Sequence, residues 1–265
     1  MQATASPSST SPGIALRDVG KRYPSGTVAL QGVSFEVRAR EFVSLLGPSG
    51  CGKSTVLRLA AGLDAPSSGH IESPAWTSAT RRDTAFVFQD PTLMPWASVF
   101  DNVWLPLRLA GRSKGEAAPA VQRVLASVGL GEFEAAFPAE LSGGMRMRAS
   151  IARALVTQPR VLLMDEPFAA LDEITRQRLN TDLLAWWQST ALSVLFVTHS
   201  VFEAVFLSQR VLVMGARPGR IVAEVLINEP TPRTAEFRTT LRYAQACREI
   251  SQALSAASLP DGIGA

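Results

Sequence analysis

Short apolar runs alternate with longer segments of helical periodicity along most of the chain. Apolar runs bounded by turn residues indicate buried strands, whereas apolar residues three or four positions apart indicate one face of a helix. The pattern predicts strands over residues 14–16, 28–30, 33–37, 42–46, 69–72, 84–88, 160–164, 192–197, 211–214 and 221–225. It predicts helices over residues 55–63, 99–110, 114–128, 143–155 and 172–188. This alternation favours an α/β fold with a mostly parallel core sheet.

Three parts of the chain depart from the alternation. Residues 1–12 are rich in Ser, Thr, Pro and Ala and are predicted to be a disordered N-terminal tail. Residues 97–158 have helical periodicity without strands, which predicts a helical subdomain inserted into a domain over residues 13–228. Residues 229–265 are predicted to be a C-terminal helical tail, with a solvent-facing helix over residues 230–256.

A glycine-rich loop joins the predicted strand 42–46 to the helix that follows it. The loop and the start of the helix consist of Gly47, Pro48, Ser49, Gly50, Cys51, Gly52, Lys53, Ser54 and Thr55. Between a strand and a helix, this spacing is typical of a phosphate-binding loop, in which backbone N–H groups surround phosphate oxygens. Lys53 is expected to reach the β- and γ-phosphates, and the Ser54 hydroxyl is expected to bind Mg²⁺. The loop predicts a nucleotide-binding protein.

Polar residues follow three other predicted strands. Gln89 follows the strand 84–88, Asp165 and Glu166 follow the strand 160–164, and His199 lies just beyond the strand 192–197. Because ligands of parallel sheets bind at the carboxyl ends of the strands, we expect these side chains to gather around the nucleotide. One carboxylate can hold Mg²⁺ while its neighbour orients the attacking water, and His199 is predicted to contact the γ-phosphate.

A second anion-binding segment opens the predicted helix 143–155. Ser142 is expected to cap this helix, and Gly143 and Gly144 leave its first N–H groups open to an anion. One small domain cannot easily fold two such segments onto one nucleotide. We therefore expect two chains to pair head to tail, so that each completes the site of the other.

Composition bears on the binding partners and the cellular location of the protein. The 265-residue chain has a net charge of only +3, and no nucleic-acid partner is expected. Its two cysteines, Cys51 and Cys247, are too few for a disulfide framework and favour a reducing compartment, and Cys51 is interpreted as an inert filler of its loop. The sequence shows neither the pattern of a secretory signal peptide nor an apolar run of about 18 residues. A cytoplasmic protein that reaches a membrane only through a partner is expected.

Taken together, these segments resemble the ordered motifs of ABC transporter ATPase subunits. The resemblance rests on residues 47–55, 141–145, 162–167 and 170–172, together with Gln89 and His199. It implies a P-loop NTPase fold with an antiparallel β subdomain beside the core sheet and the inserted helical subdomain. It also implies that the chain binds and hydrolyses ATP with Mg²⁺.

The resemblance further implies roles for single residues. Glu166 is expected to be the catalytic carboxylate, assisted by His199, Gln89 and Lys53, while Ser54, Gln89 and Asp165 surround Mg²⁺. Ser142, Gly143, Gly144 and Asp172 are expected to belong to the nucleotide sites shared by two copies. Tyr23 is expected to stack on adenine, although its place in a polar turn fits a half-buried surface residue equally well.

A narrower resemblance is to the ATPase subunits of nitrate, sulfonate and taurine importers, a family that also includes importers of pyrimidine precursors. It rests on residues 89–96, 101–103 and 217–221. It implies peripheral binding at the cytoplasmic face of a bacterial inner membrane, with membrane permease subunits as direct partners and a periplasmic solute-binding protein as an indirect one. Residues 91–96 and the helical subdomain are expected to contact the permease. The alternatives are an exporter ATPase and a soluble ABC ATPase without a transport role.

Overall fold

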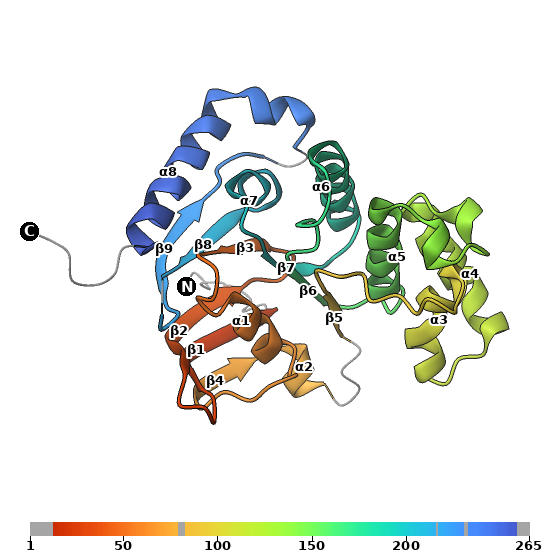
Figure 1. Ribbon diagram of the computed structural model, residues 1–265, viewed down its shortest axis with the longest axis horizontal. Coiled ribbons are helices and arrows are strands. Elements are labelled where there is room, and N and C mark those ends of the chain that lie inside the picture. Colours follow the sequence, from red (N-terminus) through yellow and green to blue (C-terminus); the bar gives the residue numbers. More distant parts are fainter. Residues whose placement is uncertain (1–12, 79–82, 216, 231–232, 259–265) are drawn as a thin grey trace, which may run out of the picture.

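A six-stranded sheet forms the centre of the protein in a computed structural model that describes residues 13–78, 83–215, 217–230 and 233–258. Its strand order is β5–β6–β7–β3–β8–β9 (Figure 1). The first five strands are parallel and β9 is antiparallel to β8, which confirms the predicted mostly parallel sheet. The strands are β3 (Phe42–Leu46), β5 (Thr84–Val87), β6 (Val161–Asp165), β7 (Ser193–Val197), β8 (Arg210–Met214) and β9 (Ile221–Leu226). The predicted tail over residues 1–12 lies outside the described residues.

A smaller antiparallel sheet lies beside the first and has the strand order β2–β1–β4. Its strands are β1 (Ile14–Arg22), β2 (Val28–Val37) and β4 (Ser68–Glu72). The prediction of separate strands at 28–30 and 33–37 was wrong, because β2 continues through Gln31 and Gly32. Its pairing with β1 shifts register several times, so that the polar pair is absorbed without ending the strand.

Two apolar layers sandwich the parallel sheet, because alternate residues of each strand point to opposite faces. On β3, Val43 and Leu45 pack with α1 (Lys53–Ala60) and the antiparallel sheet. Phe42 and Leu46 belong to the core on the other face. That face is covered by α6 (Glu173–Gln188), α7 (Val201–Leu207) and α8 (Leu241–Ser258), as Figure 1 shows. The short α2 (Pro74–Thr77) lies beyond α1.

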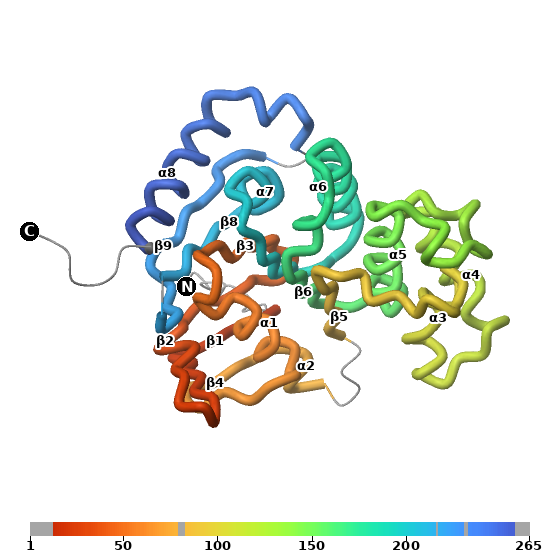
Figure 2. Tube along the Cα trace, viewed as in Figure 1, coloured from red at the N-terminus to blue at the C-terminus, as the bar shows by residue number. Residues whose placement is uncertain are grey.

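Three helices form a unit with a core of its own beside the β5 end of the sheet (Figure 2). They are α3 (Val99–Leu109), α4 (Lys114–Ser127) and α5 (Gly143–Leu155), and short 3₁₀ turns span Gly131–Phe133 and Pro138–Glu140. Each of the three helices begins at a serine, Ser98, Ser113 or Ser142, whose hydroxyl accepts a backbone N–H from the first turn. In the described residues, no helix combines the length and apolarity needed to cross a membrane.

The C-terminal segment corrects the prediction of one solvent-facing helix over residues 230–256. A 3₁₀ turn spans Ala235–Thr239, and α8 begins only at Leu241. Tyr243, Cys247 and Ile250 are buried in the core formed with α7 and the sheet. Their spacing of four and three residues defines an apolar stripe, which signals a packed helix. The helix α7, which the sequence pattern did not predict, fills the space beneath this stripe.

Candidate nucleotide-binding site

The glycine-rich loop leaves β3 and turns into α1 with the geometry that the sequence predicts. Gly50 and Gly52 have φ angles of 76° and 101°, in the left-handed region that favours glycine. A Cβ atom on Gly52 would lie 2.6 Å from the Leu30 side chain, so the position also lacks room for another residue. No side chain caps α1, whose N-cap is Gly52. The first N–H groups of the helix are therefore available to an anion.

Lys53 and Ser54 are the polar side chains of this turn. The Lys53 ammonium is largely buried and donates hydrogen bonds to the carbonyl oxygens of Gly47 at 2.8 Å and Pro48 at 3.1 Å. The Ser54 hydroxyl donates to Oδ1 of Asp165 at 3.2 Å. A hydroxyl and a carboxylate oxygen side by side are the hard oxygen ligands that Mg²⁺ prefers. The residues present therefore fit the predicted magnesium ion.

The strand order brings the other predicted residues to the same edge of the sheet. β5, β6, β7 and β3 are neighbours, so that Gln89, the acid pair at the end of β6, His199 and the glycine-rich loop all lie at the carboxyl ends of adjacent parallel strands. Gln89 is exposed just beyond β5. The Glu166 backbone N–H donates to the Val197 carbonyl at 2.9 Å, which fixes the end of β6 against β7.

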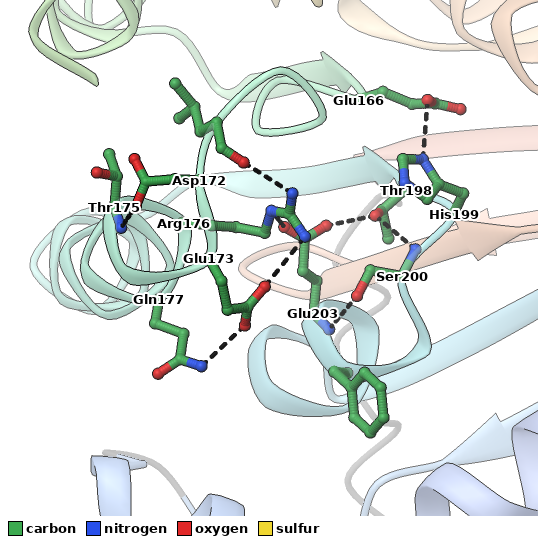
Figure 3. A network of polar contacts seen from close by, with 12 residues as sticks. Glu166, Asp172, Glu173, Thr175, Arg176, Gln177, Thr198, His199, Ser200 and Glu203 are labelled. Atoms are coloured by element: carbon green, nitrogen blue, oxygen red, sulfur yellow. Dashed lines mark hydrogen bonds and ion pairs between the residues drawn. The ribbon is translucent and has the colours of Figure 1, made fainter. Parts of the chain in front are cut away.

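Glu166 and His199 face each other at this edge (Figure 3). The distance between His199 Nδ1 and Glu166 Oε2 is 3.1 Å, and because a carboxylate only accepts, the imidazole N–H is the donor. The other carboxylate oxygen of Glu166 is 3.9 Å from the Lys53 ammonium. Glu166 has a φ of 46°, in the left-handed region that non-glycine residues seldom adopt.

Burial controls the charges at the site. It raises the pKa of the Asp165 carboxyl, and the neighbouring Glu166 raises it further, against the opposing hydrogen bond from Ser54. A bound cation would stabilise the charged form of such a carboxylate. Burial also raises the pKa of the Cys51 thiol, which is 1% exposed and therefore remains a protonated filler of the loop.

The loop borders a cavity of about 480 Å³. Glu166 and the loop residues Ser49, Gly50, Gly52, Lys53, Ser54 and Thr55 form part of its lining. Thr27, Val28, Ala29 and Arg217 complete the lining and were not predicted as site residues. Arg217 begins the Arg-Pro-Gly-Arg stretch that carries part of the narrower resemblance, and its guanidinium would lie 2.9 Å from a Cβ atom on Gly50. That stretch was the available signal for Arg217.

Tyr23 lies directly after β1 and is half-buried. Its hydroxyl is 3.4 Å from the Thr55 hydroxyl, and the Lys21 ammonium lies 5.1 Å from the centre of its ring. The structure thus brings Tyr23 next to the last residue of the predicted loop. Its stacking on adenine stays a prediction.

The second anion-binding segment lies on the helical unit and not around this cavity. Ser142 is the N-cap of α5, and its hydroxyl accepts the N–H of Met145 at 3.3 Å. A Cβ atom on Gly144 would lie 2.8 Å from the Thr175 side chain, so the segment packs tightly on the start of α6. Asp172 caps α6 by accepting the N–H of Thr175 at 2.9 Å, and this hydrogen bond lowers the pKa of its carboxyl.

Comparison with known proteins identifies the family. The family model described as ABC transporter matches residues 30–169, which include the glycine-rich loop, the α5 segment and the acid pair. The chain belongs to the ABC transporter family. As in the ATP-binding proteins of that family, its chemistry is ATP hydrolysis that drives transport, and it is one subunit of a transporter.

Sequence relatives and solved structures each match most of this ABC protein. The taurine import ATP-binding protein TauB of Rhizobium johnstonii is 49% identical over 76% of this chain and 78% of its own. The nitrate import ATP-binding protein NrtD of Synechocystis is 44% identical over 89% of this chain and 91% of its own. The solved dimer of the bacterial ABC transporter cassette MJ0796 matches with a TM-score of 0.71 at 32% identity, over 82% of this chain and all of the cassette. The predicted P-loop fold and ABC resemblance are confirmed.

Proposed function

We propose that this chain is the ATP-hydrolysing subunit of an importer for a small solute of the taurine, sulfonate, nitrate or pyrimidine-precursor type. The observation that carries hydrolysis is the Glu166 carboxylate, held between Lys53 and His199 at the border of the cavity. The relatives that import taurine and nitrate support the class of solute. Taurine is a sulfonate and nitrate is an anion, so small oxyanion groups are the shared chemistry.

Residues of the glycine-rich loop bind the phosphates in this proposal. The uncapped N–H groups at the start of α1 donate hydrogen bonds to the β-phosphate, and Lys53 exchanges its two carbonyl partners for phosphate oxygens. Ser54, Asp165 and Gln89 would hold Mg²⁺, which supplies charge compensation for the phosphates when bound. Arg217 adds a further cation at the wall of the cavity.

Glu166 accepts a proton from the water that attacks the γ-phosphate. The N–H of His199 holds one carboxylate oxygen at 3.1 Å, which leaves the other free to orient the water. Phosphoryl transfer needs little covalent help from the protein, so positioning of the water and compensation of charge account for most of the catalysis.

Two copies assemble head to tail in this proposal, and the solved MJ0796 cassette is likewise dimeric. Ser142, Gly143 and Gly144 lie on the helical unit, away from the cavity of their own chain. Gly144 is buried against α6, but Ser142 is exposed, so the first turn of α5 can meet the nucleotide of the partner at that residue. Asp172, at the exposed start of α6, belongs to the same surface.

The permease would bind beside β5. A groove of about 620 Å³ between β5, α3 and α5 is lined by Phe86, Phe88, Thr92, Leu105, Leu109 and Arg153. The loop at its border is held firmly, because the buried Asn102 amide donates to the carbonyls of Met94, Ala97 and Ser98. Trp96, in the same loop, is 78% exposed. A rigid loop that displays a large apolar side chain is suited to contact a partner protein.

ATP hydrolysis by the purified complex with the neighbouring permease and solute-binding protein tests this proposal. Taurine, an alkanesulfonate, nitrate and a pyrimidine precursor are added in turn, and stimulation by one of them is the expected result. Hydrolysis that ignores every solute, from a chain that copurifies with no membrane protein, would support a soluble ABC ATPase instead. Stimulation by a solute on the cytoplasmic side would support an exporter.

A further inference from the structure

A buried carboxylate outside the proposed catalytic groups lies next to His199. Glu203 is on the first turn of α7 and is 6% exposed. Its side chain accepts a hydrogen bond from the Thr198 hydroxyl and faces Arg176 of α6, as Figure 3 shows. Burial raises the pKa of this carboxyl. Because a buried charge is costly unless it is well paired, a carboxylate here needs an explanation beyond the filling of space.

One arm of the Glu203 network fixes the segment that carries His199. Thr198 donates its hydroxyl proton to Glu203 and accepts the Ser200 N–H at 3.0 Å. The Ser200 hydroxyl in turn accepts the Glu203 N–H at 3.3 Å. The residues on both sides of His199 are thus tied to Glu203, Thr198 through the carboxylate and Ser200 through the backbone N–H, which limits where the imidazole can point.

The other arm reaches the segment before α6. The Arg176 guanidinium donates to the Leu171 carbonyl at 2.8 Å and to Glu173 at 3.2 Å, so that it holds the residues on both sides of Asp172. Its Nε lies 3.9 Å from Glu203 Oε1. Glu203 therefore stands between the His199 segment and the Asp172 segment, which are more than twenty residues apart in the sequence.

We propose that Glu203 is a positioning residue that couples the His199 segment to the Asp172 segment through Thr198 on one side and Arg176 on the other. The inference rests on the proposed function, in which His199 serves the nucleotide of its own chain and Asp172 faces the partner. The coupling then transmits the position of the partner-facing segment to the hydrolytic water.

The distance between the Glu203 and Arg176 side chains is longer than a hydrogen bond and can shorten. Arg176 Nε and Glu203 Oε1 are both buried, and at 3.9 Å they do not form a hydrogen bond with each other. The Asn180 side chain also interacts with the Glu203 carboxyl and lowers its pKa against the effect of burial. Charge-assisted hydrogen bonds between such groups measure about 2.7–2.9 Å, so a movement of about 1 Å would close the gap of 3.9 Å. A shift of α6 toward α7 when two chains close on ATP would form the hydrogen bond between Arg176 and Glu203. Through Thr198, the same shift would change the position of His199.

A double-mutant cycle on the reconstituted complex tests the coupling. Thr198→Val removes one arm and Arg176→Met removes the other, while Glu203→Ala removes the junction. We expect each single variant to lower kcat about fivefold to tenfold and to change the KM for ATP less than about twofold, because none of these side chains contacts nucleotide. Because both arms act through one carboxylate, the double variant should lose no more than the worse single variant. The isosteric Glu203→Gln, which keeps an acceptor for Thr198, should retain more activity than Glu203→Ala.

A second measurement does not depend on activity. Amide hydrogen exchange should rise over residues 171–173 in Thr198→Val, and over residues 198–200 in Arg176→Met, since each arm stabilises the other. Ser73→Ala is the matched control, because it removes a buried hydrogen bond to the Ala60 carbonyl in another part of the protein and should leave kcat and both segments unchanged.

Two results would overturn the coupling. One is a double variant whose loss of kcat equals the product of the two single losses. The other is exchange that rises only on the arm that was mutated. A parent complex without ATP hydrolysis would refute the proposed function alone, since the exchange measurement still decides whether Glu203 joins the two segments.

Discussion

Replacing Glu166 by Gln isolates the proton-accepting role of this carboxylate. The amide has the same size and can keep a contact with His199, but it cannot accept a proton from water. General-base catalysis contributes about 10²–10⁴-fold to a rate, which corresponds to about 3–5 kcal/mol of activation free energy. We therefore expect Glu166→Gln to lower the rate of ATP hydrolysis by at least about a hundredfold.

Nucleotide binding should respond in the opposite direction. The Glu166 carboxylate lies 3.9 Å from the Lys53 ammonium. With effective dielectric constants between 80 and 20, a charge pair at that separation attracts by roughly 1–4 kcal/mol, and the site is partly exposed, so the lower end applies. Removing the negative charge frees Lys53 for phosphates. The affinity of Glu166→Gln for ATP should therefore be unchanged or higher.

Phosphate release under single-turnover conditions and equilibrium binding of a fluorescent ATP analogue measure the two effects separately. Glu132→Gln is the matched control, because Glu132 is an exposed carboxylate in a 3₁₀ turn of the helical unit. It should leave both quantities at the parental values. A Glu166→Gln variant that hydrolyses ATP as fast as the parent would refute the assignment of Glu166 as the proton acceptor.

Three further predictions concern residues around the site and its support. Arg217→Ala should raise the KM for ATP about fivefold, because it removes from the cavity wall one exposed cation that contributes about 1 kcal/mol. The control Arg112→Ala should leave the KM unchanged, and equal KM values for the two variants would contradict a contact between Arg217 and the nucleotide. Arg233→Ala should lower the free energy of unfolding in urea by about 3 kcal/mol, because the buried guanidinium donates to three carbonyls at the end of α7; a loss below about 1 kcal/mol would contradict that role. Burial raises the pKa of Glu203 in the folded state above its ordinary 4.5. Between the unfolded-state and folded-state pKa values the folded protein therefore binds more protons than the unfolded protein, so the stability of the folded state falls as the pH rises through that range. The thermal midpoint of Glu203→Gln relative to the parent should therefore rise as the pH increases above 4.5, and a constant difference would contradict the raised pKa.

The parts of the site that the sequence reveals are those whose geometry is local. The glycine-rich loop lies between a strand and a helix that are adjacent in the chain, and glycine at positions 50 and 52 has a direct backbone reason in the positive φ angles. Asp165 and His199 could be predicted together because parallel strands share one carboxyl edge, whatever their order. The sequence did not reveal the strand order β5–β6–β7–β3. The prediction that these side chains gather required only that all the strands end at the same carboxyl edge of the sheet.

Contacts between distant segments could not be predicted in this way. Arg217 reaches the cavity because the backbone of Gly219 packs against Cys51 and pairs with Ala29, and no local pattern encodes that approach. No sequence motif singles out Glu203, and its proposed role arises only because α6 brings Arg176 beside it. The C-terminal helix was misjudged for the same reason, since its three buried residues matter only once α7 lies beneath them.

The C-terminal segment also packs against α7, the helix that follows His199. The Arg233 guanidinium caps the last turn of α7, and Arg238 stacks on the Phe206 ring with its guanidinium carbon 3.4 Å from the ring centre. The Tyr243 hydroxyl donates to the Phe202 carbonyl at 3.0 Å, in the first turn of the same helix. Since α7 begins two residues after His199, three contacts from the C-terminal segment fix the helix on which the His199 segment is mounted. The conformation of the imidazole that contacts Glu166 thus depends on residues that lie outside the proposed nucleotide site.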